Sequence, residues 1–129
     1  MAPTRRVVLA AALAFAAFPA AAQTRIEAIE VDEVKRGLAD GSIDLVDVRE
    51  PDEWAAGHVE GARLLPLSQF DPSKLPQAKE GRKIVVMCRS GSRSQRAIAA
   101  AQAAGRSDVK LNFTGGILAW QSSGGAVAR

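Results

Sequence analysis

A single cysteine, Cys88, lies between an apolar run and an alanine-rich run, in the segment Val85-Val86-Met87-Cys88-Arg89-Ser90-Gly91-Ser92-Arg93-Ser94. A cysteine attacks as the thiolate, and its ordinary pKa of about 8.5 keeps most of it protonated at neutral pH. Backbone N–H groups at the start of a helix and nearby guanidinium groups both stabilise an anion. The spacing therefore predicts a nucleophilic, sulfur-handling thiolate at Cys88.

The residues after the cysteine are small or basic, as an anion-binding loop requires. Gly91 permits a tight backbone curve, and serine hydroxyls can donate to oxyanions from an open pocket. Arg49 follows another predicted strand, where it either helps to bind an anion or forms an ion pair with Asp47 or Glu53. The alternative for Cys88 itself is a buried small hydrophobe, which its polar and basic neighbours disfavour. We predict Cys88 as catalytic, and as substrate-binding residues Arg89, Ser90, Gly91, Ser92, Arg93, Ser94 and Arg49.

The first 22 of the 129 residues have the pattern of a secretory signal peptide. Arg5 and Arg6 precede an uncharged apolar stretch over 7–18, and Ala20-Ala21-Ala22 follows Pro19 as a cleavage site. The apolar stretch is too short to cross a bilayer, so a retained membrane anchor is disfavoured. We expect cleavage after residue 22 and a periplasmic or secreted protein that leaves the membrane. The arginine pair leaves the general secretory and the twin-arginine routes both open.

Charge and composition limit the partners and cofactors. Losing Arg5 and Arg6 with the signal lowers the formal net charge from +3 to +1, which gives little support for nucleic-acid binding. The span 81–107 contains basic residues and no Asp or Glu, and forms either a solvated basic face or a positive field around Cys88. One Cys and one His supply no metal-ligand set, so we expect no metal site. One cysteine also excludes an internal disulfide.

Apolar patterns and turn residues place the elements that position the cysteine. Strands are predicted at 43–48, 63–67, 84–87 and 109–113, and helices at 31–39, 51–56, 94–104 and 115–120. This alternation predicts an α/β fold: one domain with a mostly parallel central sheet and helices on both faces. The expected division is a lead-in at 23–28, the domain at 29–121 and a flexible tail at 122–129. Ligands bind beyond the carboxyl ends of such strands, where Cys88 and residues 47–50 both lie.

Three motifs, at residues 47–62, 88–93 and 115–120, follow one another in the order found in the rhodanese family of sulfurtransferases, and each resembles a motif of that family. The Cys88 loop is similar to the active-site loop of the thiosulfate-using branch. Residues 47–50, 53–54 and 57–62 are similar to the family's D-V-R-E, E-[FWY] and G-H-[IV]-x-G-A elements, and 115–117 with Trp120 to its closing G-G-[IV] and W. The layout is similar to single-domain exported members of the phage shock protein E type. The resemblance implies a rhodanese-like domain, no cofactor, and structural use of the turn that holds His58.

The resemblance also implies a reaction. Cys88 takes the outer sulfur of a small anionic donor such as thiosulfate, becomes a persulfide, and passes the sulfur to cyanide or a thiol acceptor. An alternative is a sulfur carrier or thiol-redox module that serves an exported partner protein. A cysteine phosphatase is the remaining rival, but such enzymes place five residues between Cys and Arg. Here four residues separate Cys88 from Arg93, and position 94 is a serine without a guanidinium for phosphate.

Overall fold

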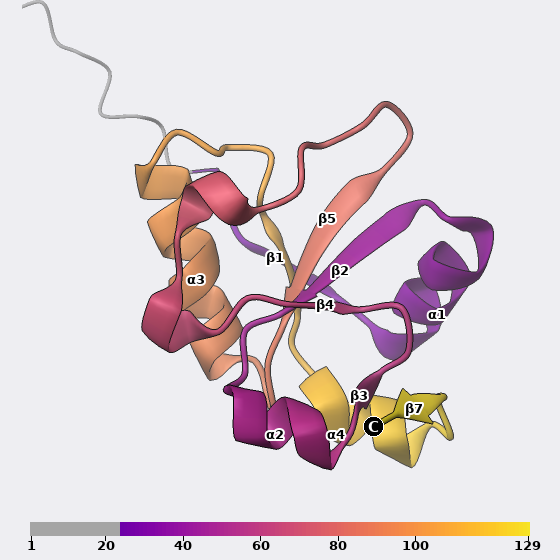
Figure 1. The fold of residues 1–129 in the computed structure, drawn as a ribbon. Coiled ribbons are helices and arrows are strands. Elements are labelled where there is room, and N and C mark those ends of the chain that lie inside the picture. Colours follow the sequence, from indigo (N-terminus) through magenta and orange to yellow (C-terminus); the bar gives the residue numbers. More distant parts are fainter. Residues whose placement is uncertain (1–23) are drawn as a thin grey trace, which may run out of the picture.

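A computed structural model describes residues 24–129, so the predicted signal peptide, residues 1–22, lies outside the described residues. Five parallel strands form the central sheet in the order β1-β6-β5-β2-β4. Figure 1 labels four of them, β1, β5, β2 and β4. Their bounds are β1 (Glu27–Ile29), β2 (Ile43–Asp47), β4 (Arg63–Leu64), β5 (Lys83–Met87) and β6 (Leu111–Phe113). This sheet confirms the predicted α/β class.

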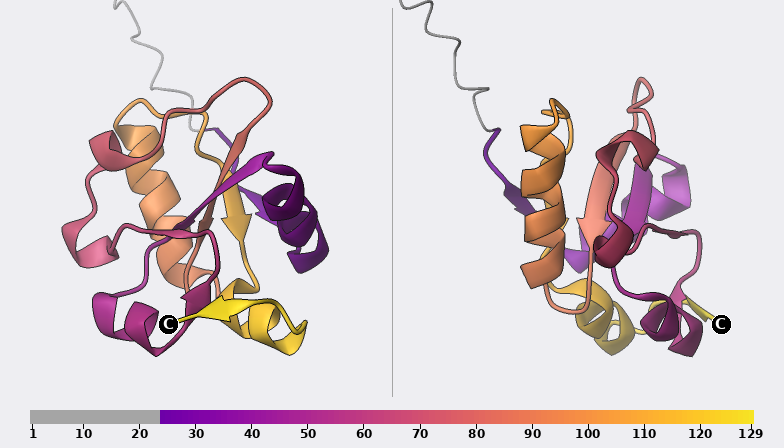
Figure 2. Two further views of the ribbon diagram at one scale, coloured as in Figure 1. Left: turned by 45° about the vertical axis from the view of Figure 1, so that its right-hand side comes forward. Right: turned by 60° about the vertical axis from the view of Figure 1, so that its left-hand side comes forward.

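Helices cover both faces of the sheet, as predicted. Figure 2 shows α1 (Val31–Asp40) on one face and α3 (Ser92–Ala103) on the other. Successive residues of β5 point to opposite faces: Val86 packs in the cluster beneath α3, whereas Val85 packs in the cluster that includes Val34 of α1. Because β5 is buried on both faces, its sequence is continuously apolar from Ile84 to Met87 rather than alternating.

Short elements gather at the carboxyl edge of the sheet. These are α2 (Pro51–Ala56) after β2, and α4 (Gly116–Ser122) after β6. Pro51 begins α2, and the Glu50 and Glu53 carboxylates each accept from the other residue's backbone N–H, a reciprocal cap. Two 3₁₀ turns, η1 (Leu67–Gln69) and η2 (Pro72–Lys74), lie in the long connection to β5. The reciprocal cap fixes Glu53 at the edge where Cys88 emerges.

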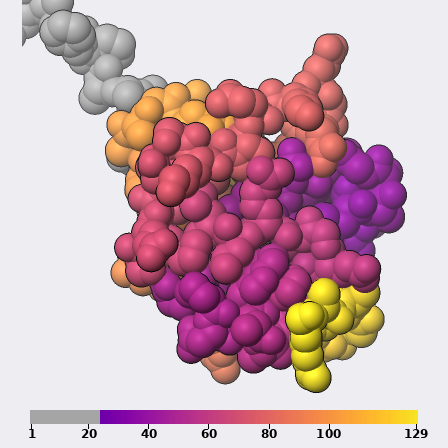
Figure 3. Space-filling model, viewed as in Figure 1, coloured from indigo at the N-terminus to yellow at the C-terminus, as the bar shows by residue number. Residues whose placement is uncertain are grey.

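The C-terminal segment departs from the predicted flexible tail at 122–129. It turns back and forms β7 (Val127–Ala128), which pairs antiparallel with β3 (His58–Val59). The buried Trp120 donates from its indole N–H to the Ala126 carbonyl at 3.0 Å and so holds the returning chain. In Figure 3 this yellow end of the chain lies against the purple-magenta segment that holds β3. The sequence does not predict this contact, because residues 122–129 are polar and glycine-rich, a composition typical of a flexible chain end.

Two further boundaries differ from those predicted. Residues 27–28, assigned to the lead-in, belong to β1 and pair with β6, so the folded domain begins before residue 29. Helix α3 begins at Ser92 rather than 94, which places Arg93 in its first turn. Across residues 24–129, no helix has the length and apolar character needed to cross a membrane.

Candidate active site

Cys88 stands at the carboxyl end of β5, between the sheet and the first turn of α3. The loop closes tightly here: Gly91 has a φ of 98°, and a Cβ on it would lie 2.8 Å from the Thr114 carbonyl oxygen. A Cβ on Gly116, whose φ is 56°, would collide with the backbone oxygens of Cys88 and Arg89. Both positions therefore require glycine, which explains Gly91 in the loop and Gly116 at the start of α4.

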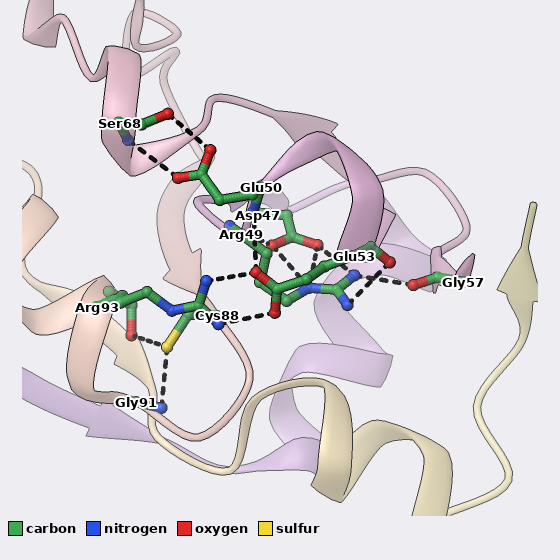
Figure 4. Close-up of polar contacts among 10 residues, drawn as sticks. Asp47, Arg49, Glu50, Glu53, Gly57, Ser68, Cys88, Gly91 and Arg93 are labelled. Carbon is green, nitrogen blue, oxygen red and sulfur yellow. Dashed lines mark hydrogen bonds and ion pairs between the residues drawn. The ribbon is translucent and has the colours of Figure 1, made fainter. Parts of the chain in front are cut away.

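The sulfur has two polar neighbours. The Gly91 N–H donates to Cys88 Sγ at 3.1 Å, and Ser94 Oγ lies 3.4 Å from the sulfur, as Figure 4 shows for Gly91. Burial raises the thiol pKa, but hydrogen bonding between the sulfur and the Ser94 side chain, and with the amides of Ser94, Ser90 and Gly91, outweighs it, so the net shift is downward. The direction agrees with the expectation of a thiolate, and its cause is hydrogen bonding rather than guanidinium charge.

The sulfur is more enclosed than the small loop residues suggest. Cys88 is only 1% exposed and shares the apolar cluster beneath α3 with Val86 and Ala97. Ser90 and Ser92 are exposed, whereas Ser94 is fully buried. The structure thus places Gly91 and Ser94 at the sulfur, and it does not show the open pocket that the sequence predicts.

Arg93 does not stand free beside the cysteine. Its two terminal nitrogens donate to the two carboxylate oxygens of Glu53 at 2.5 and 2.8 Å, and Figure 4 shows the two side chains pointing toward one another. Hydrogen bonding to Arg93 outweighs the effect of burial and lowers the pKa of Glu53 to about 2. Sequence reasoning did not select Glu53 as a site residue; the signal available was its place in the E-[FWY] element.

Arg49 forms the ion pair that the sequence left as one of two alternatives. Its Nε and Nη2 donate to the carboxylate of Asp47, at 3.0 and 2.8 Å to Oδ2, and Nη2 also donates to the Gly57 carbonyl at 2.9 Å. Asp47 is fully buried and Arg49 is 5% exposed. The pair thus ties β2 to the end of α2, and most of the guanidinium is occupied by the fold.

A hollow of about 230 Å³ lies next to this region, lined by Arg49, Glu53, Ala56, Gly57, Arg89, Ile117, Leu118 and Gln121. Of the two arginines that line this hollow, Arg89 is exposed and Arg49 is buried in its ion pair, so the Arg89 guanidinium is the one more accessible to an anion. Cys88 does not line this hollow. A larger hollow of about 400 Å³ lies at the opposite, amino edge of the sheet, between Glu27, Ile84 and Lys110, so size alone does not locate the chemistry.

His58 and Trp120, which lie in the other two family-like motifs, have structural contacts. The His58 ring stacks on Trp54 with centroids 3.6 Å apart, and its Nδ1 lies 3.0 Å from the Trp54 carbonyl oxygen. The buried Trp120 belongs to the core cluster on the α1 face. Within residues 24–129, no group of three or more His, Cys, Asp or Glu side chains is arranged to hold a metal ion. Asn112, buried on β6 beside Ser94, was not selected from the sequence, where nothing distinguishes it from an ordinary strand residue.

The family model for the rhodanese-like domain matches residues 30–123, and the chain therefore belongs to the rhodanese-like domain family. A protein named sulfurtransferase from Allochromatium vinosum is 36% identical over 100 residues, covering 77% of this chain and 92% of the relative. Together these matches support a sulfurtransferase-type function.

Other similar proteins differ in how much of their length this chain covers. An uncharacterized protein from Synechocystis sp. is 45% identical over 80 residues, which is 62% of this chain but only 44% of the relative. A probable adenylyltransferase/sulfurtransferase from Mycobacterium tuberculosis is 44% identical over 80 residues, which is 59% of this chain but only 19% of the relative. A solved structure from Rhodopseudomonas palustris has a TM-score of 0.64 and 28% identity, covering 80% of this chain and 85% of that one. It is described as a protein of unknown function and "Possible Tyrosine Phosphatase".

Proposed function

We propose that the protein is a thiosulfate-type sulfurtransferase that works through a persulfide on Cys88. The thiolate attacks the outer sulfur of thiosulfate, an S–S bond forms to Sγ, and sulfite leaves with the electron pair of the broken bond. Cyanide or an acceptor thiolate then attacks the terminal sulfur of the persulfide, and the Cys88 thiolate is regenerated. The observation that carries the proposal is the Gly91 N–H directed at Sγ, 3.1 Å away, in a loop of this family.

The enclosed sulfur sets a condition on this reaction. Because Cys88 is only 1% exposed, an incoming donor has to displace part of what covers the thiolate before the thiolate can attack the outer sulfur of the donor. The Arg93–Glu53 ion pair lies at that edge of the sheet. A donor anion can open this pair, because it can replace the Glu53 carboxylate on the Arg93 guanidinium. Arg89, exposed on the adjacent hollow, supplies a second positive charge.

Intact-mass analysis tests the proposal directly. The purified protein, incubated with thiosulfate and freed of excess reagent, should gain the mass of one sulfur atom and lose it again on adding cyanide, with thiocyanate as product. The mass of the protein as isolated from its host also reports whether residues 1–22 are removed. A protein that binds no sulfur under these conditions, while its thiol still reacts with an alkylating agent, would contradict the assignment.

Arg93 and Glu53 should have opposite effects on donor binding. Arg93→Ala removes a positive charge and leaves the Glu53 carboxylate unopposed near the sulfur, so KM for thiosulfate should rise roughly tenfold. Glu53→Gln removes the competing carboxylate and should lower KM, by roughly threefold. Steady-state kinetics at low and high ionic strength measure both, because high salt should shrink each change. A fall in KM for Arg93→Ala would contradict a donor-binding role.

We also propose that the protein is exported, on the basis of residues 1–22, and acts in the periplasm or outside the cell. A non-turnover sulfur carrier or thiol-redox module for an exported partner is the alternative within this proposal. Slow transfer to free cyanide combined with fast transfer to a partner thiol would identify the carrier.

The designation of the R. palustris neighbour favours a phosphatase as a second candidate. The loop geometry opposes it: Arg93, the arginine nearest to the required position, is held by Glu53, and position 94 carries the buried Ser94. If the purified protein takes up no sulfur from thiosulfate but hydrolyses an aryl phosphate, the protein is a phosphatase and not a sulfurtransferase.

A further inference from the structure

Four hydrogen bonds form a closed ring around the sulfur of Cys88. The Gly91 N–H donates to Sγ at 3.1 Å, and Sγ lies 3.4 Å from Ser94 Oγ. The Ser94 hydroxyl donates to Asn112 Oδ1 at 2.6 Å, and Asn112 Nδ2 donates to the Gly91 carbonyl at 3.1 Å. The ring thus begins and ends at Gly91, and it joins the loop, helix α3 and strand β6.

The orientation of the Asn112 amide is fixed by its neighbours. The Gly91 carbonyl only accepts hydrogen bonds, so it must face the amide NH₂, and Oδ1 must face Ser94. The register supports this placement, because Asn112 pairs with Val86 of β5 and shares the sheet face that α3 covers. With both amide atoms occupied and Asn112 only 3% exposed, the side chain has no room to exchange its partners for water.

The proton count of the ring then has a consequence for the cysteine. The Ser94 hydroxyl carries one proton, and that proton is directed at Asn112, so in the thiol state the S–H must be the donor to Ser94 Oγ. Every member of the ring is satisfied in this state. When the cysteine loses its proton, Ser94 either keeps its bond to Asn112 and presents a lone pair to the sulfur anion, or turns to the sulfur and leaves Asn112 Oδ1 without a donor.

We propose that Asn112 is a positioning residue that holds the Ser94 proton away from Cys88 in the resting protein and yields it to the sulfur when the thiolate forms. Asn112 therefore favours the protonated cysteine, while the Gly91 amide favours the anion. The opposition lets the ring influence how far the lone thiol is ionised before a donor arrives. The inference rests on the proposed function only in taking the Cys88 thiolate as the reactive form.

The charges around the ring do not replace this effect. Arg93 on α3 is paired with Glu53 on α2, and Asp47 on β2 is paired with Arg49, so each pair adds little net charge. Arg89 is the exposed charge of the loop, and β6 and α4 contain no charged residue. Removing Asn112 changes none of these groups, so a change in thiol ionisation after its removal reports on the ring.

The test is an ultraviolet titration of the thiolate in four proteins: wild type, Asn112→Leu, Ser94→Ala and the double variant. Leucine has nearly the shape of asparagine and neither accepts nor donates. Freed from Oδ1, the Ser94 hydroxyl donates to the sulfur anion, and the Cys88 pKa should fall by about one unit, which is about tenfold more thiolate at a fixed pH below it. In the Ser94→Ala background the same Asn112→Leu change should produce no fall.

A merely structural role predicts the opposite sign. If Asn112 only fastens the loop through Gly91, its removal loosens the amide that stabilises the anion, and the Cys88 pKa rises with or without Ser94. A rise, no change, or a fall that persists in the Ser94→Ala background overturns the proposal.

Nuclear magnetic resonance of the wild-type protein provides a test that needs no variant. The Asn112 side-chain amide signals should shift with the same midpoint as the Cys88 titration, because Oδ1 loses its donor as the thiolate forms; signals that stay constant overturn the proposal. Both measurements follow ionisation without any sulfur donor. Failure to take up sulfur from thiosulfate would therefore refute the proposed function without deciding the role of Asn112. The titration and the amide signals decide that role.

Discussion

Replacing Cys88 with serine is expected to abolish sulfur uptake and transfer, lowering turnover to background, by about a thousandfold or more. The hydroxyl ionises far less readily than a thiol, and its oxygen cannot be converted to a persulfide by thiosulfate. No other cysteine is present in the chain to take over the reaction. The test combines intact-mass analysis after incubation with thiosulfate and a thiocyanate assay with cyanide as acceptor.

The matched control is the stability of the same variant. Serine fits the space of cysteine and can still accept from the Gly91 N–H, so the free energy of unfolding should change by no more than about 1 to 2 kcal/mol. A variant that folds normally and transfers no sulfur assigns the chemistry to Cys88. Normal sulfur transfer by Cys88→Ser would remove the cysteine from the mechanism.

The features that sequence reasoning predicted correctly are written in short stretches of chain. The apolar run 84–87 and the alanine-rich run 94–104 correspond to β5 and α3, and Pro51 with the acids after it marks the start of α2. Alternation of strands and helices then leads to the parallel sheet, since few topologies accommodate it. Because Cys88 directly follows β5, its place at the carboxyl edge could be predicted as well.

The features that sequence reasoning missed depend on residues far apart in the chain. Glu53 meets Arg93 across 40 positions, and Ser94 meets Asn112 across 18. Neither pairing leaves a local pattern, since a glutamate in a first helical turn and an asparagine in a strand have ordinary explanations. The basic span 81–107 illustrates the same limit: Arg82 and Arg93 are neutralised by Asp44 and Glu53 from a different part of the sequence.

The strand at the C-terminus was missed for a related reason. Val127 and Ala128 pair with β3, whose two residues, His58 and Val59, lie inside what reads as a turn. Two-residue strands have too little periodicity to be recognised, and their stability comes from contacts such as the indole of Trp120 on Ala126. Short pairings of this kind are set by the packed core beneath them rather than by their own composition.

Replacing Arg49 with methionine is expected to destabilise the fold by about 3 to 5 kcal/mol, because the Asp47 carboxylate is then left buried without its partner. Asp47 is fully buried, and Arg49 supplies it with contacts from Nε and Nη2 at 2.8 to 3.1 Å. The measurement is the free energy of unfolding from urea denaturation at neutral pH. A loss of this size would give Arg49 a role in holding β2 to α2.

The double variant Asp47→Leu with Arg49→Met is the matched control, because it removes both charges and fills their space with apolar side chains. Its stability should recover part of the loss, since a buried ion pair adds little over well-packed apolar residues. It should remain about 1 to 3 kcal/mol below wild type, because the buried Arg49 N–H loses its acceptor, Asp47 Oδ1 at 3.0 Å. The same proteins separate the two roles that Arg49 could have from sequence. If Arg49→Met unfolds at the wild-type denaturant concentration but raises KM for thiosulfate severalfold, Arg49 binds the donor, and its pairing with Asp47 is a resting arrangement that the substrate replaces.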